Sequence, residues 1–217
     1  MMGMGDWDKI YQEKGEVHPE VLPKVKKAAI SFKMKGYRKI LDLGCGTGRH
    51  SIFLAKEGFT VYATDISKTA IKLTENKAKS LDIDNIYFQQ HDMREIPFPN
   101  SFFDAVICVW TLMHGTLKDI TKTINEIYRV LKPNGMLITD LNSIEDVTYG
   151  TGKKIEHNTF IGVEGWEDLP HHYSTEDEVV ELFTKFKRAS IRPGEQSYKD
   201  DRGTKHIVKA FDIEATK

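Results

Sequence analysis

The apolar positions of the chain alternate between short continuous runs and longer segments with helical spacing. The continuous runs are typical of buried parallel strands, and spacings of three and four residues predict amphipathic helices. Strands are expected at residues 38–44, 59–65, 84–92, 102–110 and 135–141, and helices at 48–58, 67–81 and 117–131. Strand–helix–strand repeats of this kind predict a parallel sheet with helices on both faces.

The rhythm stops after the fifth strand. Residues 142–173 are rich in Gly, Asn, Thr and charged side chains, which indicates a lid or a substrate-binding insertion. Residues 174–186 form a further expected helix, with a capping box at Ser174 and Asp177 or at Thr175 and Glu178. The runs 189–198 and 205–213 predict a closing antiparallel hairpin. The expected fold is α/β: a Rossmann-like, doubly wound, mostly parallel seven-stranded sheet with a C-terminal antiparallel hairpin and an insertion after the fifth strand.

The N-terminal residues 1–36 read as a helical segment of the same single domain, 1–217. Trp7, Ile10 and Tyr11 share one helical face, and the helix expected at 18–39 carries a basic polar face. Both features favour helices that pack on the sheet. An RNA-facing basic patch is the alternative for the second helix.

The composition of the chain argues against several classes of protein. The chain has 217 residues, of which 40% are hydrophobic and 29% charged, and a net charge of −1, which argues against nucleic acid as a partner. No run approaches the roughly 20 apolar residues that span a bilayer, and the N-terminus does not resemble a signal peptide. The two cysteines, Cys45 and Cys108, are too few for a disulfide framework, so a reducing cytoplasm is the expected location.

The sequence LDLGCGTG at 41–48 places three glycines directly after the first strand. Glycines there allow a tight turn and let a ligand lie against the backbone, and the following helix offers free N–H groups. The spacing is not the G-x-G-x-x-G of dinucleotide-binding proteins. Asp42, just before the glycines, suits a cationic ligand. Asp65, at the end of the second strand, can accept hydrogen bonds from both hydroxyls of a ribose.

Four segments together resemble the class I S-adenosylmethionine-dependent methyltransferases over residues 39–141. They are LDLGCGTG, HDM at 91–93, FPNSFFDAVICVWTLMH at 98–114 and LKPNGMLITDL at 131–141. The resemblance implies S-adenosylmethionine as cofactor, with Asp65 on the ribose, Asp92 on the adenine amino group and the Met93 backbone on the ring. The residues implied at the cofactor are Tyr11, Asp42, Gly44, Cys45, Gly46, Asp65, Ile66, Asp92, Met93 and Val109.

Finer features of the resemblance favour a small-molecule acceptor. GRHSIFLA and the C-terminal hairpin look closest to the tellurite-resistance-type and ubiquinone-biosynthesis-type enzymes. The tetrad N/D-P-P-Y of the branches that methylate adenine or glutamine amides is absent, since residues 109–112 read VWTL. The acceptor itself is not implied, because no family pattern matches the insertion.

Methyl transfer from a sulfonium needs alignment of donor and acceptor, and it needs a general base only if the acceptor carries a proton. His114, after the fourth strand, is the best-placed candidate base. His171, His172 and Tyr173 end the insertion and can fold over the site, and of these His172 and Tyr173 are kept as candidate catalytic residues. Phe160 and Trp166 are candidates for lining an apolar acceptor pocket or for packing within the lid. No H-x-x-x-H pair with supporting acids is present, so no metal is expected.

The expected function is methyl transfer from S-adenosylmethionine to a small molecule, by a monomer or homodimer with no membrane partner. Two alternatives stay open: an RNA or protein methyltransferase of the same fold, and a cofactor-binding module without transfer activity. The glycine spacing argues against a nicotinamide-dependent oxidoreductase.

Overall fold

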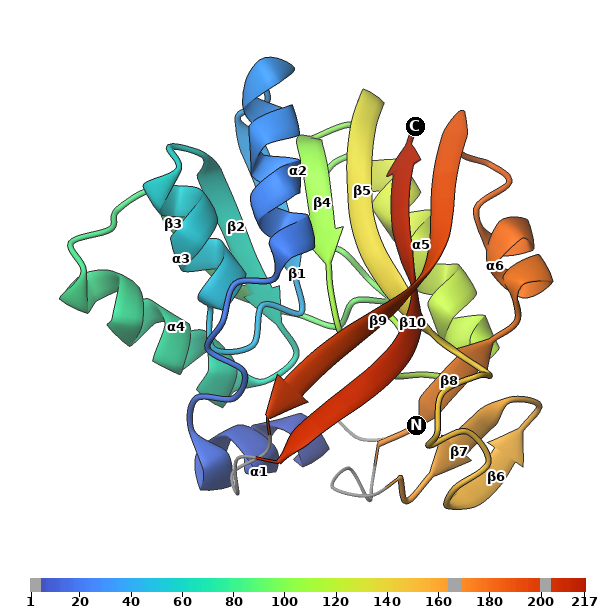
Figure 1. Ribbon diagram of the computed structural model, residues 1–217. Coiled ribbons are helices and arrows are strands. Elements are labelled where there is room, and N and C mark those ends of the chain that lie inside the picture. Colours follow the sequence, from blue (N-terminus) through green and yellow to red (C-terminus); the bar gives the residue numbers. More distant parts are fainter. Residues whose placement is uncertain (1–4, 164–168, 200–203) are drawn as a thin grey trace.

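The computed structural model describes residues 5–163, 169–199 and 204–217, and its centre is a twisted sheet (Figure 1). The strands run in the order β3-β2-β1-β4-β5-β10-β9, in which β1 to β5 are parallel and β10 is antiparallel to both neighbours. Their bounds are β1 Lys39–Leu43, β2 Thr60–Asp65, β3 Ile86–Gln90, β4 Phe103–Cys108, β5 Leu131–Ser143, β9 Arg188–Lys199 and β10 Lys205–Thr216. The Rossmann-like, mostly parallel sheet with its closing hairpin is therefore confirmed.

Helices cover both faces of the sheet, as the strand–helix repeat predicts. The helices are α1 Gly5–Lys14, α2 Pro23–Met34, α3 Arg49–Lys56, α4 Lys68–Ser80, α5 Leu117–Val130 and α6 Glu176–Leu182. Helices α2, α3 and α4 pack on one face, where Ile40 of β1 is buried. Helices α5 and α6 pack on the other face against Leu41 and Leu43. Successive residues of β1 therefore point into two separate cores.

Polar caps fix where the helices begin. Ser67 accepts a hydrogen bond from the N–H of Ala70 at the start of α4, and Thr116 forms a capping box with Asp119 at the start of α5. Of the two boxes considered for α6, the structure uses Thr175, whose hydroxyl accepts from the N–H of Glu178. Helix α2 begins later than expected because Pro23 lies in its first turn, a position that proline favours.

The insertion contains strands that the sequence did not indicate. They are β6 Lys153–Glu156, β7 Thr159–Ile161 and β8 His171–Ser174. They form an antiparallel ribbon, and β8 pairs with the end of β5 through Asn142–Tyr173 and Ser143–Ser174. The described residues thus hold ten connected strands where seven were expected, because the ribbon adds three.

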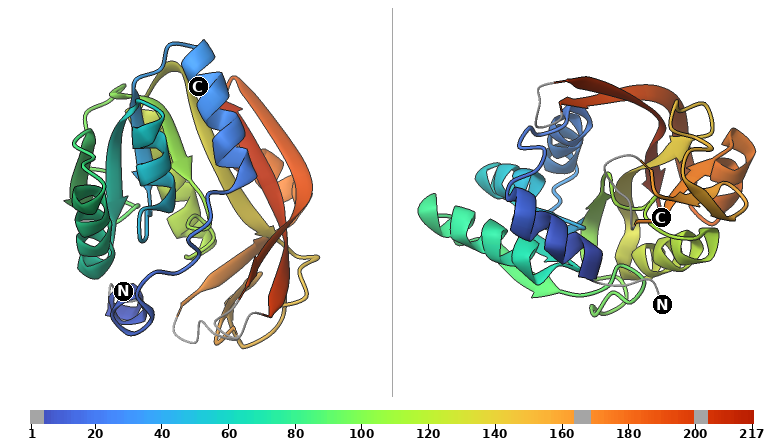
Figure 2. Two further views of the ribbon diagram at one scale, coloured as in Figure 1. Left: turned by 60° about the vertical axis from the view of Figure 1, so that its left-hand side comes forward. Right: turned by 90° about the horizontal axis from the view of Figure 1, so that it is seen from below.

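Helix α1 and the insertion lie at the same end of the sheet, below the carboxyl ends of β1 and β4 (Figures 1 and 2). Asp8 anchors α1 to the start of α4: its carboxylate accepts from the Ser67 hydroxyl at 2.7 Å and from the Thr69 N–H at 2.8 Å. No helix among the described residues is long and apolar enough to cross a membrane.

Candidate functional site

A cavity of about 950 Å³ lies at the carboxyl ends of the parallel strands. The glycine loop, the ends of β2 and β4, helix α1, the insertion and the outer part of the β9–β10 hairpin all contribute to its wall. The volume is at the upper end of the range for ligand pockets, about 300–1,000 Å³. It therefore has room for a nucleoside-sized ligand and a second molecule beside it.

The glycine loop forms one wall of the cavity, and two of its glycines leave no room for a side chain. The φ angles of Gly44 and Gly46 are +73° and +53°, a region that other residues seldom adopt. A Cβ on Gly44 would lie 2.3 Å from the Thr111 side chain, and one on Gly46 would lie 2.8 Å from the Tyr11 hydroxyl. The N–H of Gly44 and the N–H of Cys45 both donate to the Thr64 carbonyl, which ties the loop to β2.

Asp65 lies beside this loop and lines the cavity. Its carboxylate accepts from the N–H groups of Gly46 and Ser67, both at 2.9 Å. Burial raises the pKa of Asp65 to about 6, and the backbone hydrogen bonds partly oppose the rise. A carboxylate has about four acceptor positions, so Asp65 keeps acceptor capacity for hydroxyl groups of a ligand.

Asp42 does not reach the cavity, contrary to the expectation that it faces a cationic ligand. It lies on β1 and is 2% exposed, and its Oδ2 accepts from the Ser51 hydroxyl of α3 at 2.5 Å. Burial raises its pKa to about 7, although the Ser51 bond opposes the rise. Asp42 therefore joins β1 to α3 behind the glycine loop.

The segment after β3 brings Asp92 and Met93 to the cavity, as expected from the sequence. The Asp92 carboxylate is paired with the Arg94 guanidinium, whose Nε lies 2.9 Å from Oδ1. Burial favours the protonated form of Asp92, but Arg94 outweighs burial and lowers the pKa. Arg94 also donates to Asp119 at 3.1 Å, so it links the segment to the start of α5. Arg94 has no motif of its own in the sequence, and only its place two residues after Asp92 points to it.

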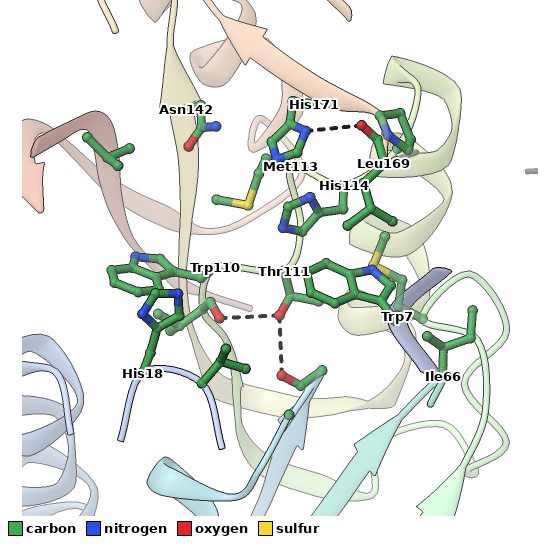
Figure 3. A pocket seen from close by; sticks show the side chains of 18 of the residues that line it. Trp7, His18, Ile66, Trp110, Thr111, Met113, His114, Asn142, Leu169 and His171 are labelled. Atoms are coloured by element: carbon green, nitrogen blue, oxygen red, sulfur yellow. Dashed lines mark hydrogen bonds between the residues drawn. The ribbon is translucent and has the colours of Figure 1, made fainter. Parts of the chain in front are cut away.

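Two histidines meet on the cavity wall (Figure 3). The rings of His114 and His171 lie edge to face with centroids 4.7 Å apart, and Trp7 of α1 contacts His114 at 4.9 Å. Nδ1 of His114 is buried and has no hydrogen-bond partner in the described part of the chain. Burial lowers the pKa of His114 well below its usual range and that of His171 to about 4. Both rings are therefore neutral at pH 7, and a neutral imidazole has one nitrogen that can accept a hydrogen bond.

His172 points to the opposite side of the ribbon and does not line the cavity. Its Nδ1 lies 2.7 Å from the Thr159 hydroxyl and its Nε2 lies 2.7 Å from the Glu178 carboxylate. The side chain is fully buried, so these contacts leave it no access to a ligand. We therefore assign it to the packing of the ribbon on α6, in place of the expected catalytic role.

Tyr173 does line the cavity, two residues after His171 on the same face of β8. Its hydroxyl lies 2.8 Å from that of Thr148, and burial raises its pKa to about 12, so it is no base at neutral pH. Phe160 packs against Tyr173 in a small apolar cluster and is not part of the cavity wall. Trp166 lies outside the described residues.

The remaining cofactor candidates, Tyr11, Cys45, Ile66 and Val109, all line the cavity. The structure adds Arg49 and Trp110, which the sequence analysis had not proposed: the Arg49 guanidinium lies 4.6 Å from the centre of the Trp110 ring. Arg49 stands where the pattern G-x-G-x-x-G, starting at Gly44, would have its third glycine. Trp110 carried no signal beyond its place at the end of a strand.

The residues present fit the adenosylmethionine that the motifs imply. The glycine loop offers a surface without side chains, Asp65 retains free acceptor positions for ribose hydroxyls, and the buried Nε2 of His91 has no partner among the described residues. His91 directly precedes Asp92, and both residues line the cavity. These features match a nucleoside ligand that approaches the loop with its ribose toward β2.

Comparisons with known proteins agree with this geometry. Residues 40–135 match the model of a methyltransferase domain family. A putative methyltransferase of Bacillus subtilis, YqeM, is 39% identical over 62% of this chain and 56% of its own length. The ubiquinone/menaquinone biosynthesis C-methyltransferase UbiE of Vibrio cholerae is 32% identical over 46% of this chain and 40% of its own. The chain thus spans only about half of these curated relatives.

A solved structure extends the likeness over nearly the whole chain. The crystal structure of a SAM-dependent methyltransferase from Methanosarcina mazei superimposes with a TM-score of 0.70 at 26% identity, covering 91% of this chain and 98% of that one. The motifs, the strand order and these similarities agree. Over residues 40–135 the chain is similar to a methyltransferase domain, and its fold is that of the S-adenosylmethionine-dependent methyltransferases.

Proposed function

We propose that the protein transfers the methyl group of S-adenosylmethionine to a small molecule that carries an O–H or N–H group. The observation that carries the proposal is the continuity of the cavity, which runs from the glycine loop and Asp65 to the His114–His171 pair. One compartment suits the cofactor. The other ends at two neutral histidines, which suit an acceptor that must lose a proton.

The surroundings of the second compartment support a small acceptor. Residues of α1, the insertion and the hairpin contribute to its wall, and together they leave less room for a protein or RNA chain. The near-neutral charge gives no electrostatic attraction for nucleic acid. The relative UbiE is named for a reaction in quinone biosynthesis, which also concerns a small molecule.

The chain's own residues supply binding and alignment. When bound, S-adenosylmethionine supplies a methyl group already activated by the positive charge on its sulfur. Asp65 accepts hydrogen bonds from the ribose, and the Asp92–Arg94 pair lies where the adenine edge is expected. Tyr11 closes over Gly46 and excludes water. Such positioning can supply about 7–11 kcal/mol of the barrier.

His114 receives the proton of the acceptor in this proposal. Its depressed pKa keeps the imidazole neutral, and the unpaired Nδ1 is satisfied once a donor on the acceptor pairs with it. His171 packs against the ring and holds its own orientation through Nδ1, which lies 3.1 Å from the Leu169 carbonyl. A carbon or thioether acceptor would leave this nitrogen unpaired.

The cofactor is tested by calorimetric titration. S-adenosylmethionine and S-adenosylhomocysteine are both expected to bind, while NAD and NADP show no heat of binding, because the glycine spacing and Asp65 suit an adenosine without a pyrophosphate. Preferential binding of NAD or NADP would contradict the proposal.

The base is tested with the variant His114→Gln and a panel of phenols, catechols and N-heterocycles. The measured quantity is the rate at which S-adenosylhomocysteine forms from S-adenosylmethionine. The variant should lose about 10²–10⁴ in kcat, the usual contribution of a general base, and keep its affinity for S-adenosylhomocysteine. His157→Gln, which changes an exposed histidine outside the cavity, is the matched control. Equal rates in the two variants would remove His114 from the mechanism.

A further inference from the structure

Trp110 leaves β4 in an unusual backbone conformation. Its φ angle is +56°, in the left-handed region that a bulky side chain rarely adopts. Such conformations persist only where the surrounding structure fixes them, and they are concentrated at functional sites. Trp110 and its neighbours Val109 and Thr111 all line the cavity. The surroundings of Trp110 therefore determine the shape of this wall.

Both N–H groups of Trp110 are held from behind the wall. The backbone N–H donates to Oδ1 of Asp140 at 2.8 Å, and the indole N–H donates to the side-chain oxygen of Gln196. Asp140 lies on β5 and is completely buried, and Gln196 lies on β9 and is 8% exposed. Two strands that are distant in the sequence thus fix one residue.

The same two side chains belong to a closed polar cluster. Lys24 of α2 donates to the second oxygen of Asp140 at 2.8 Å and also contacts Asp212 of β10. The Gln196 amide donates to Asp212 at 3.0 Å. Burial favours the neutral form of Lys24, but the two carboxylates outweigh it and raise the pKa, so Lys24 stays charged. Asp140 is fully buried, whereas the Asp212 side chain is 42% exposed, and every member of the cluster has a partner.

The sheet does not need this cluster to join its hairpin. Residues 136–142 of β5 already pair with residues 210–216 of β10, and β10 pairs with β9 along its length. Burying charged groups carries a desolvation penalty, and apolar packing of the same volume often stabilises a protein as well or better. On the cavity wall, the cluster holds the two N–H groups of Trp110. This points to a role for the cluster in fixing the cavity wall.

Trp110 and Thr111 also contact the glycine loop and the start of α3 behind it. The Arg49 guanidinium covers the Trp110 ring. The next residue, Thr111, packs so closely on Gly44 that no Cβ fits between them, and its hydroxyl donates to the Gly44 carbonyl at 3.3 Å. His114 lies three residues further along the same turn. A displacement of Trp110 would move the glycine loop and the candidate base relative to each other.

We propose that Asp140 and Gln196 are positioning residues for methyl transfer. They hold Trp110 in its left-handed conformation, and the turn between β4 and α5 thereby keeps the acceptor wall aligned with the cofactor loop. The effect on methyl transfer rests on the proposed function. The effect on the conformation of Trp110 rests on the hydrogen bonds alone. Breaking a hydrogen bond of the cluster should therefore lower the rate of methyl transfer more than it lowers the affinity for the cofactor.

The test uses Gln196→Met, which removes the acceptor of the indole N–H but keeps the length of the side chain. The Trp110 indole signal, identified as the one missing in Trp110→Phe, is followed by ¹⁵N NMR in the protein saturated with S-adenosylhomocysteine. Hydrogen exchange of this N–H should be at least tenfold faster in Gln196→Met. Transfer to the best phenol or N-heterocycle of the panel should be at least tenfold slower, and the Kd of S-adenosylhomocysteine should change less than threefold.

Two comparisons distinguish positioning from general destabilisation. Glu195→Met alters the exposed neighbour on the same strand and should leave all three measurements unchanged. Trp110→Phe, which removes the indole N–H and keeps an aromatic ring, should slow transfer as much as Gln196→Met, and combining the two should cause no further loss. Additive losses, unchanged exchange, or an unchanged transfer rate would overturn the proposal. If S-adenosylhomocysteine fails to bind the wild-type protein, the proposed function fails, while exchange in the ligand-free protein still reports whether Gln196 holds Trp110.

Discussion

Replacing Gly44 with alanine should weaken the binding of S-adenosylhomocysteine at least about a hundredfold. The residue has a φ angle of +73°, and a Cβ would lie 2.3 Å from the Thr111 side chain. Left-handed strain costs roughly 1–2 kcal/mol and overpacking about 1–3 kcal/mol more. The loop can relieve both only by moving, which removes the surface that the ligand contacts. Calorimetric titration measures the loss directly.

Gly58→Ala is the matched control for this variant. Gly58 has a φ angle of +90°, but nothing lies within 4 Å of the position of a Cβ. Its substitution should lower the free energy of unfolding by roughly 1–2 kcal/mol through strain alone and leave the ligand affinity unchanged. If Gly44→Ala bound S-adenosylhomocysteine as tightly as Gly58→Ala, the close approach of the loop to the ligand would be wrong.

Asp65→Ala should have a comparable effect for a different reason. If the carboxylate accepts from both ribose hydroxyls, the variant loses two charge-assisted hydrogen bonds of about 1.5–3 kcal/mol each, or at least about a hundredfold in affinity. The N–H groups of Gly46 and Ser67 lose a partner, but a buried carboxylate of raised pKa is removed as well. Thermal unfolding without ligand should therefore change less than binding does. Asp84→Ala, at an exposed acid before β3, should alter neither.

The pH dependence of binding gives a second measurement on Asp65. The ribose hydroxyls donate to the ionised carboxylate, and its pKa in the free protein is raised to about 6. Below that pH, binding must first remove a proton, so affinity should fall as the pH decreases through about 6, by up to about tenfold per pH unit. Asp65→Asn should show no such fall. An affinity that is constant from pH 8 to 5 in the wild-type protein would contradict the role of Asp65.

The centre of the sheet could be predicted from the sequence because β1 and β4 are buried on both faces. A continuous apolar run such as residues 102–110 is typical of a central parallel strand, and the glycines after β1 mark the ligand edge of such a sheet. The strands of the insertion left no such signal. Strands β6 and β7 are only four and three residues long, and β6 carries mostly charged side chains. Their pairing with β8 depends on contacts that no local pattern records.

Strand geometry explains which of the predicted site residues line the cavity and which do not. Successive side chains of a strand point to opposite sides. His171 and Tyr173 therefore face the cavity, while His172 between them faces α6. Asp42 likewise faces α3 from β1. A sequence indicates the alternation but does not tell which set of positions faces the ligand, unless the neighbouring elements are known.

The polar cluster behind Trp110 was beyond prediction for another reason. Its members come from α2, β5, β9 and β10, and each one alone is an ordinary polar residue. The left-handed conformation of Trp110 has no sequence signature, since glycine or asparagine would be the usual residue there. Long-range side-chain networks of this kind become visible only once the topology has placed the strands side by side.

The way the ribbon is attached gives the molecule a modular boundary. β5 pairs with β10 up to Asn142, and it then pairs with β8 through Asn142 and Ser143 only. Two residue pairs therefore make up the whole strand pairing between the ribbon and the central sheet. In the proposed function, changes within residues 144–172 would therefore alter the acceptor wall with little effect on the strand pairing of the half proposed to bind the cofactor.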